Sequence, residues 1–248
     1  MKDVLGEALT DQYHHTFSGK LWVHNKYGPK EEMPVNVYFR DAENMPELEW
    51  LALQQCRGRI LDIGAGAGSH ALVLQGMGHD VTALDISPKA ASIMKERGVQ
   101  KILQQDFFDL EVTDSGSQPV VNGALQPAQD GFDTLLLLMN GIGLAGTLDG
   151  LRRFLAKAQR LLRPGGRLVF DSSDIAYLYG GNPEPPAGKD YYGEIDYQYE
   201  YKRQRSDWFK WLFIDRRTLK EIAGREGWKT EVLFEDEWDQ YLVRCERQ

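Results

Sequence analysis

Residues 59–69 of this chain read Arg59-Ile60-Leu61-Asp62-Ile63-Gly64-Ala65-Gly66-Ala67-Gly68-Ser69. The apolar run predicts a buried strand, the three alternate glycines predict a tight turn, and the apolar periodicity that follows predicts a helix. A turn without side chains lets a ligand lie against bare backbone, and the free N–H groups at the helix start attract negative charge. The stretch therefore predicts a nucleotide-type site at the carboxyl end of the first strand of an α/β fold.

The spacing of the glycines separates two kinds of nucleotide site. A dinucleotide fingerprint, G-x-G-x-x-G, counted from Gly64, needs a third glycine at position 69, where Ser69 stands. From Asp62 to Gly68 the chain instead reads D-x-G-x-G-x-G, which resembles motif I of the class I S-adenosylmethionine-dependent methyltransferases. That resemblance implies S-adenosylmethionine as the cofactor, held in part by Asp62, Gly64, Ala65 and Gly66.

Two further strand ends carry residues that suit this cofactor. Residues 79–85 predict a second strand that ends in Asp85, whose carboxylate can accept hydrogen bonds from both ribose hydroxyls, with Ile86 beside it. A third strand leads to Asp106 and Phe107. By the resemblance, Asp106 accepts the exocyclic amine of adenine and Phe107 packs on the ring.

The fourth strand, residues 132–139, ends at Asn140, which the resemblance places in the cofactor site near the transferred methyl. The Asn-Pro-Pro sequence typical of nucleobase amino-methyltransferases is absent, because Asn140 is followed by Gly141-Ile142. An amphipathic helix over residues 148–162, a Pro-Gly-Gly turn and a fifth strand over 167–171 also resemble a late motif of the family.

The implied architecture is α/β, a Rossmann-like doubly wound sheet of seven strands, mostly parallel with an antiparallel last strand. We expect residues 1–57 to form an N-terminal cap segment and residues 58–248 to form the methyltransferase domain. Insertions are expected at about 111–131 and at 173–214. The first of these is rich in Gly, Ser, Gln and Pro, which predicts a surface loop.

The second insertion contains a predicted β-hairpin over about 191–214. Tyrosines at 197, 199 and 201 alternate with polar residues, which predicts a half-buried strand, and residues 205–207 predict the turn before a second strand. Such a hairpin is equally compatible with a wall of the substrate pocket, a dimer contact or an extension of the main sheet. The residues expected to contact substrate, in the cap and around this insertion, are Tyr13, His15, Arg40, Asp171 and Tyr177.

Composition limits the partners. The formal net charge is −8 over 248 residues, which argues against free nucleic acid as a substrate, because contacts to phosphates supply most of that affinity. No signal peptide or membrane span is recognised, so the cytoplasm is the default expectation. Cys56 and Cys245 lack metal-ligand spacing, and no metal is expected. The oligomeric state stays open.

The expected reaction is direct in-line transfer of the sulfonium methyl group to a small molecule. A sulfonium has a good leaving group, so the protein has chiefly to align the reactants and exclude water. Asp171 and the pair His14-His15 are candidates for a base, but none is assigned a catalytic role. A protein acceptor, a non-catalytic S-adenosylmethionine-binding module and, less favoured by Ser69, an NAD-linked oxidoreductase are the alternatives.

Overall fold

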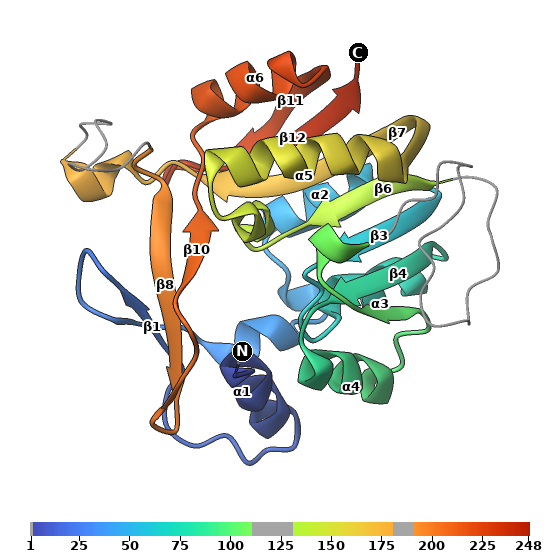
Figure 1. Ribbon diagram of the computed structural model, residues 1–248. Helices are drawn as coiled ribbons and strands as arrows, with labels where there is room; N and C mark the ends of the chain where they lie inside the picture. Colours follow the sequence, from blue (N-terminus) through green and yellow to red (C-terminus); the bar gives the residue numbers. More distant parts are fainter. Residues whose placement is uncertain (1, 111–130, 181–190) are drawn as a thin grey trace.

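The computed structural model describes residues 2–110, 131–180 and 191–248, and its main element is a seven-stranded sheet (Figure 1). The predicted loop over 111–131 lies outside these residues apart from position 131. The strand order is β11-β12-β7-β6-β3-β4-β5, and the pairs among β3 to β7 are parallel. β12 is antiparallel to both β7 and β11, so the predicted doubly wound sheet with an antiparallel strand near one edge is confirmed. The strands are β3 (Arg59–Ile63), β4 (Asp80–Asp85), β5 (Ile102–Gln104), β6 (Phe132–Leu137), β7 (Leu162–Ser173), β11 (Trp228–Glu235) and β12 (Gln240–Arg247).

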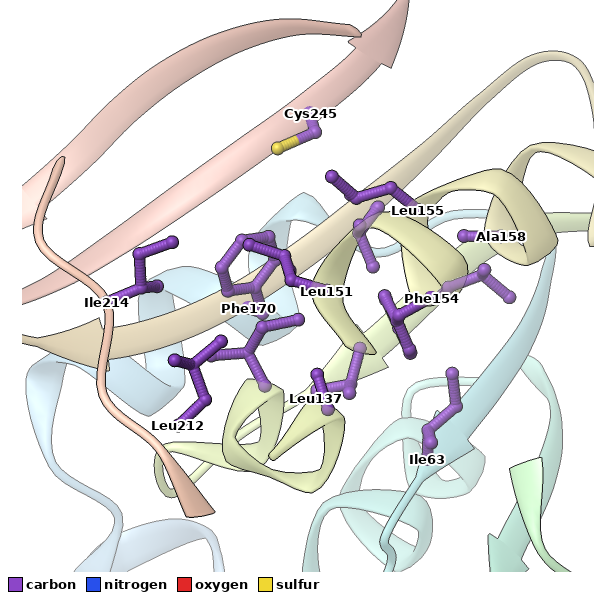
Figure 2. Packing of buried hydrophobic residues seen from close by; sticks show 14 of the residues in the cluster. Ile63, Leu137, Leu151, Phe154, Leu155, Ala158, Phe170, Leu212, Ile214 and Cys245 are labelled. Atoms are coloured by element: carbon purple, nitrogen blue, oxygen red, sulfur yellow. The ribbon is translucent and has the colours of Figure 1, made fainter. Parts of the chain in front are cut away.

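Helices cover both faces of this sheet because successive residues of its strands point to opposite sides. On one face, Leu61 of β3 and Leu135 of β6 pack against α5 (Leu148–Leu161) and α6 (Arg216–Arg225). On the other face, Ile60 and Leu136 pack against α2 (Glu47–Gln55), α3 (Ser69–Gly76) and α4 (Pro88–Arg97). Figure 2 shows the first of these cores, with residues of α5 directed toward the sheet. It labels Ile63, Leu137, Leu151, Phe154, Leu155, Ala158, Phe170, Leu212, Ile214 and Cys245.

The helix ends follow the capping chemistry of the sequence. The Ser87 hydroxyl accepts a hydrogen bond from the Ala90 N–H at the start of α4, and Gly98 ends that helix in the left-handed region. Asp215 caps α6 in the same way, by accepting from the Thr218 N–H at 2.9 Å. Short 3-10 helices fill several connections: η1 (Val35–Phe39), η2 (Ala42–Asn44), η3 (Phe107–Asp109), η4 (Gly141–Ala145) and η5 (Ala176–Tyr179).

A second, separate sheet stands beside the first (Figure 1). Its strands run in the order β10-β8-β1-β2, with β9 paired to β8. The N-terminal segment supplies β1 (Trp22–Asn25) and β2 (Glu31–Glu32). The insertion after β7 supplies β8 (Glu194–Tyr201), β9 (Gln204–Arg205) and β10 (Phe209–Leu212). The predicted hairpin therefore exists, and it does not extend the main sheet.

The hairpin turn differs from the prediction. It lies at Lys202 and Arg203, which adopt φ values of 48° and 64°, and not at residues 205–207. Ser206 interrupts the ladder after the turn. Its hydroxyl accepts from the Tyr199 N–H at 3.0 Å, and its own N–H donates to the Tyr199 carbonyl. Ser206 therefore resembles a turn residue in sequence but acts as a side-chain bridge within the hairpin.

An N-terminal helix, α1 (Val4–Tyr13), joins the two sheets. It packs against α4 of the main domain and against β8 of the second sheet. Ala8 and Leu9 of α1 are fully buried together with Ile93 and Tyr201. Across the described ranges, no helix combines the length and apolar character that a membrane crossing requires.

Candidate functional site

A cavity of about 550 Å³ lies where the carboxyl ends of β3, β4, β5 and β6 face the second sheet. This is the end at which open α/β sheets bind ligands, and the volume is in the range of small-molecule sites. Every residue that the sequence analysis assigned to the cofactor lines it: Asp62, Gly64, Ala65, Gly66, Asp85, Ile86, Asp106, Phe107 and Asn140.

The glycine turn presents its backbone to this cavity. Gly64 has φ 74°, and a Cβ built on it meets no atom within 4 Å, so the turn is open on that side. Gly66 has φ 56°, and a Cβ there would lie 3.2 Å from the ring of Tyr38. Both positions combine a left-handed backbone with close access from the cavity, which is why they are glycine. Gly68 faces away, against Met94 and Val99, and lets α3 approach α4.

Asp85 connects the end of β4 to the glycine turn. One carboxylate oxygen accepts from the Gly66 N–H and the other from the Ser87 N–H, each at 2.8 Å. Burial raises the pKa of Asp85, and these two backbone bonds oppose that rise. The carboxylate therefore shapes the turn and faces the cavity at the same time.

A charged network that the sequence did not predict lies beside the turn. The Arg40 guanidinium donates to one oxygen of Glu49, and the His70 Nε2 lies 3.0 Å from the other. Burial raises the pKa of Glu49, but the His70 and Arg40 contacts bring it below its ordinary value. Burial lowers the pKa of His70, yet Glu49 and Asp62 together raise it. The two hydrogen-bonded pairs are 9 and 21 positions apart in the chain, so no local motif could reveal them.

Asp62 is the least satisfied member of this region. It is only 2% exposed, and its Oδ2 has no hydrogen-bond partner within the part of the chain that the structure describes. Burial raises its pKa to about 6. A buried carboxylate oxygen without a partner, lining a cavity, is suited to a ligand that brings a positive charge or an N–H donor.

At the next strand end, Asp106 and Phe107 open η3. The Asp106 Oδ1 accepts from the Phe108 N–H at 2.8 Å, and its half-buried carboxylate lines the cavity. Phe107 is 4% exposed and packs on Phe154 with 4.5 Å between ring centroids. The ring is therefore part of the hydrophobic core, and only a small part of it is exposed to the cavity.

Asn140 stands in a strained turn at the end of β6. Met139 and Asn140 have φ values of 60° and 56°. The Asn140 N–H donates to both oxygens of Asp171 at 2.9 Å. Its side chain donates to the Leu212 carbonyl and accepts from the Ser172 hydroxyl, both at 3.2 Å. Asn140 therefore lines the cavity while its side chain is committed to the protein.

Of the residues predicted to contact substrate, the structure brings only Arg40 to the cavity wall. Tyr13 instead stacks on Phe39 at 6.2 Å, His15 is exposed at φ 58°, and Tyr177 is 64% exposed on η5. Asp171 is 1% exposed and is occupied by Asn140 and Gln240. A residue that is close in sequence to cavity residues can still point its side chain away from the cavity, because its helix or strand sets the direction of that side chain.

Several aromatic wall residues were not singled out from the sequence. They come from η1, from the second sheet and from the residue that follows β10: Tyr38, Tyr197, Tyr199, Trp211 and Phe213. The alternation of tyrosines in 195–201 was the signal for two of them, since alternate residues share one face of a strand.

The residues around the glycine turn fit S-adenosylmethionine. They offer bare backbone at Gly64 and Gly66, a strand-end carboxylate at Asp85 and an unpartnered buried carboxylate at Asp62. In the described residues, no group of three or more His, Cys, Asp or Glu could hold a metal ion.

Comparisons with known proteins agree with this geometry. The family model described as a methyltransferase domain matches residues 61–170. The crystal structure of an S-adenosylmethionine-dependent methyltransferase from Bacteroides fragilis, in complex with S-adenosyl-L-homocysteine, is 40% identical. The match covers 99% of this chain and 95% of that one, with a TM-score of 0.84. The chain therefore belongs to the S-adenosylmethionine-dependent methyltransferase family.

More distant relatives differ in substrate. Glycine N-methyltransferase from Rattus norvegicus is 27% identical over 194 residues, which are 76% of this chain and 62% of that protein. The chain thus spans less than two thirds of that relative. Demethylmenaquinone methyltransferase from Tropheryma whipplei is 32% identical over 110 residues, 44% of this chain and 39% of that protein.

Proposed function

We propose that this protein transfers the methyl group of S-adenosylmethionine to a small-molecule acceptor that is enclosed between the strand ends of the main sheet and the second sheet. One observation carries the proposal: a single cavity is lined on one side by the glycine turn and on the other by the aromatic residues of β8 and β10. A non-catalytic binding module would need no such second wall.

We assign the cofactor contacts as follows. The cofactor lies against the protein backbone at Gly64 and Gly66, and Asp85 accepts hydrogen bonds from the ribose hydroxyls. Asp106 accepts from the exocyclic amine of adenine. Arg40 and Asp62 carry opposite charges on the same wall, which suits the carboxylate and the amino group of the methionine part.

When bound, the cofactor supplies a methyl group on a sulfonium, which leaves as a neutral sulfide. The tasks of the chain are alignment and exclusion of water. Oriented reactants gain roughly 7–11 kcal/mol over free collision. Trp211 contributes rigidity here: a Cβ on Gly143 would lie 2.1 Å from its Nε1, so the indole is seated directly against η4. The Asn140 turn fixes the backbone at the end of β6 next to this wall.

The relatives support a small acceptor, since glycine and demethylmenaquinone appear in their names. The volume of about 550 Å³ supports it as well, because it suits a cofactor and a compact second molecule.

The test uses the purified protein and methyl-labelled S-adenosylmethionine. Calorimetry first measures binding of the cofactor and of S-adenosylhomocysteine. Label transfer is then measured with a cell extract divided into a small-molecule fraction and a protein fraction. We expect label in the small-molecule fraction, and less of it with Asp85→Ala. Label confined to protein would overturn the small-molecule acceptor, and absence of cofactor binding would overturn the whole proposal.

A further inference from the structure

The second sheet has two chemically different faces. Its register places Glu31, Val23 and Tyr199 in one row, because Val23 pairs with both of the others across the strands. Residues directly opposite one another in an antiparallel pair share a face. By the same rule Asn25 and Tyr197 form the next row, and these five residues all line the cavity.

The lysines of this sheet lie on the opposite face. Lys210 pairs across the strands with Asp196, and both are one position removed from the cavity rows. There Asp196 forms ion pairs with Lys26 and Lys210, and Glu200 pairs with Lys30 and Arg205. The basic side chains of the sheet therefore lie in ion pairs on the face away from the cavity, whereas the face toward the cavity carries aromatic rings and Glu31.

Acidic residues outnumber basic residues in the lining of the cavity. Its lining includes one Arg, one His and no Lys, and both Arg40 and His70 are paired with Glu49. The carboxylates that line it are Glu31, Glu32, Glu49, Asp62, Asp85 and Asp106. Among the described residues Glu32 has a cationic partner in Lys20, whereas Glu31 forms no ion pair. A carboxylate at a ring-lined wall attracts a cation, as do the faces of Tyr and Trp.

We propose that the acceptor is an amine without a carboxylate or phosphate group, held by Tyr197, Tyr199 and Trp211 with Glu31 at the rim. This proposal rests on the proposed function above. It excludes an amino-acid acceptor, because Arg40 is assigned above to the carboxylate of the cofactor and His70 is held by Glu49, so the described wall offers no further basic side chain to a second carboxylate.

The charge balance of the reaction fits this wall. The neutral amine nitrogen donates its lone pair to form the C–N bond, and the C–S bond breaks with its electron pair left on sulfur. One positive charge therefore moves from sulfur to nitrogen and is not cancelled. A tertiary amine yields a quaternary ammonium with no proton to remove, whereas a primary or secondary amine afterwards loses one proton to water. Aromatic faces and Glu31 stabilise the charge at its final position, where an anionic acceptor would be repelled.

The experiment measures binding to the protein saturated with S-adenosylhomocysteine. The probes are benzyltrimethylammonium, its uncharged isostere neopentylbenzene, and phenylacetate as an anion of similar size. We expect the cation to bind at least about tenfold more tightly than the isostere, since a desolvated cation–π contact is worth about that factor or more. Phenylacetate should bind most weakly.

Variants connect this preference to the wall. Tyr199→Leu and Trp211→Leu should each reduce the affinity for benzyltrimethylammonium about tenfold, whereas Tyr199→Phe, which keeps the ring, should retain it. Trp208→Leu is the matched control, because Trp208 is 45% exposed and does not line the cavity. Glu31→Gln should weaken the cation about two- to fivefold at low salt.

The outcomes separate the two proposals. If S-adenosylhomocysteine binds but the cation gains nothing over neopentylbenzene, or phenylacetate binds better, the amine acceptor is refuted and the cofactor assignment stands. The same holds if the leucine variants bind the cation as the parent does. If S-adenosylhomocysteine itself fails to bind, both proposals fall.

Discussion

Replacing Asp85 with alanine should lower both the stability of the protein and its affinity for S-adenosylmethionine. The variant loses two hydrogen bonds to a carboxylate, from the Gly66 and Ser87 N–H groups at 2.8 Å. Bonds to charged groups are worth about 1.5–3 kcal/mol each, but removing the carboxylate also relieves the burial that raises its pKa. A net loss of about 1.5–3 kcal/mol is expected, or roughly 3–12 °C in melting temperature.

The effect on binding should be of similar size. Loss of the ribose acceptor should weaken S-adenosylmethionine about 10- to 150-fold. Linkage makes this visible in denaturation experiments: cofactor at 100 times the parent Kd stabilises the parent by about 2.7 kcal/mol, but stabilises a variant that binds 100-fold more weakly by only about 0.4 kcal/mol. Denaturation with and without cofactor, together with calorimetry, measures both effects.

Asp80→Ala is the matched control because it removes an aspartate from the other end of β4. Asp80 forms exposed ion pairs with Lys101 at 2.6 Å and Arg59 at 3.8 Å, which are worth about 0–1 kcal/mol and lie away from the cavity. If Asp85→Ala lowers stability but leaves the cofactor Kd unchanged, the carboxylate serves only the glycine turn and the ribose assignment is wrong.

Three further variants test other parts of the site. Gly66→Val should abolish cofactor binding in calorimetry, because φ is 56° and a Cβ at this position would lie 3.2 Å from the Tyr38 ring. An affinity near that of the parent would show that the cofactor binds elsewhere. Asp62→Asn should gain stability relative to the parent as pH rises from about 4 to about 7. Burial raises the Asp62 pKa to about 6, so the folded parent holds this proton more tightly than the unfolded chain and loses stability over that interval. A difference in unfolding free energy that does not change with pH would contradict this reasoning. Gly143→Ala should displace the Trp211 indole, because the new Cβ would lie 2.1 Å from its Nε1. Methyl transfer should fall, while the cofactor Kd measured by calorimetry stays within about twofold. Unchanged turnover would show that Trp211 does not contact the acceptor.

The main sheet and its glycine turn could be predicted because their signals are local. A strand-end acid, glycines in a left-handed backbone and a Ser or Asp cap each follow from the chemistry of a few neighbouring residues. The caps at Ser87 and Asp215, and the positions of Asp62 and Asp85 at strand ends, are direct examples.

The aromatic wall of the cavity could not be predicted to the same degree. The strand at 194–201 has a clear alternation, but its partner β1 is more than 170 residues away, and periodicity carries no information about such pairing. The N-terminal cap segment, residues 1–57, supplies β1 and β2 and so pairs one edge of β8, which its local sequence did not indicate. The position of Asp85 at a strand end could be predicted, whereas the two backbone N–H groups that its carboxylate holds could not.

The turn at Met139 and Asn140 connects the two sheets through hydrogen bonds. Left-handed conformations in residues other than glycine cost about 1–3 kcal/mol each, and Asn tolerates them better than Met. This turn is stabilised by Asp171 of β7, which accepts the Asn140 N–H with both oxygens and is itself held by Gln240 of β12. The Asn140 amide then donates to the Leu212 carbonyl at the end of β10. Asp171 therefore stabilises one strained turn that connects the end of β6 with the end of β10, the strand that carries Trp211.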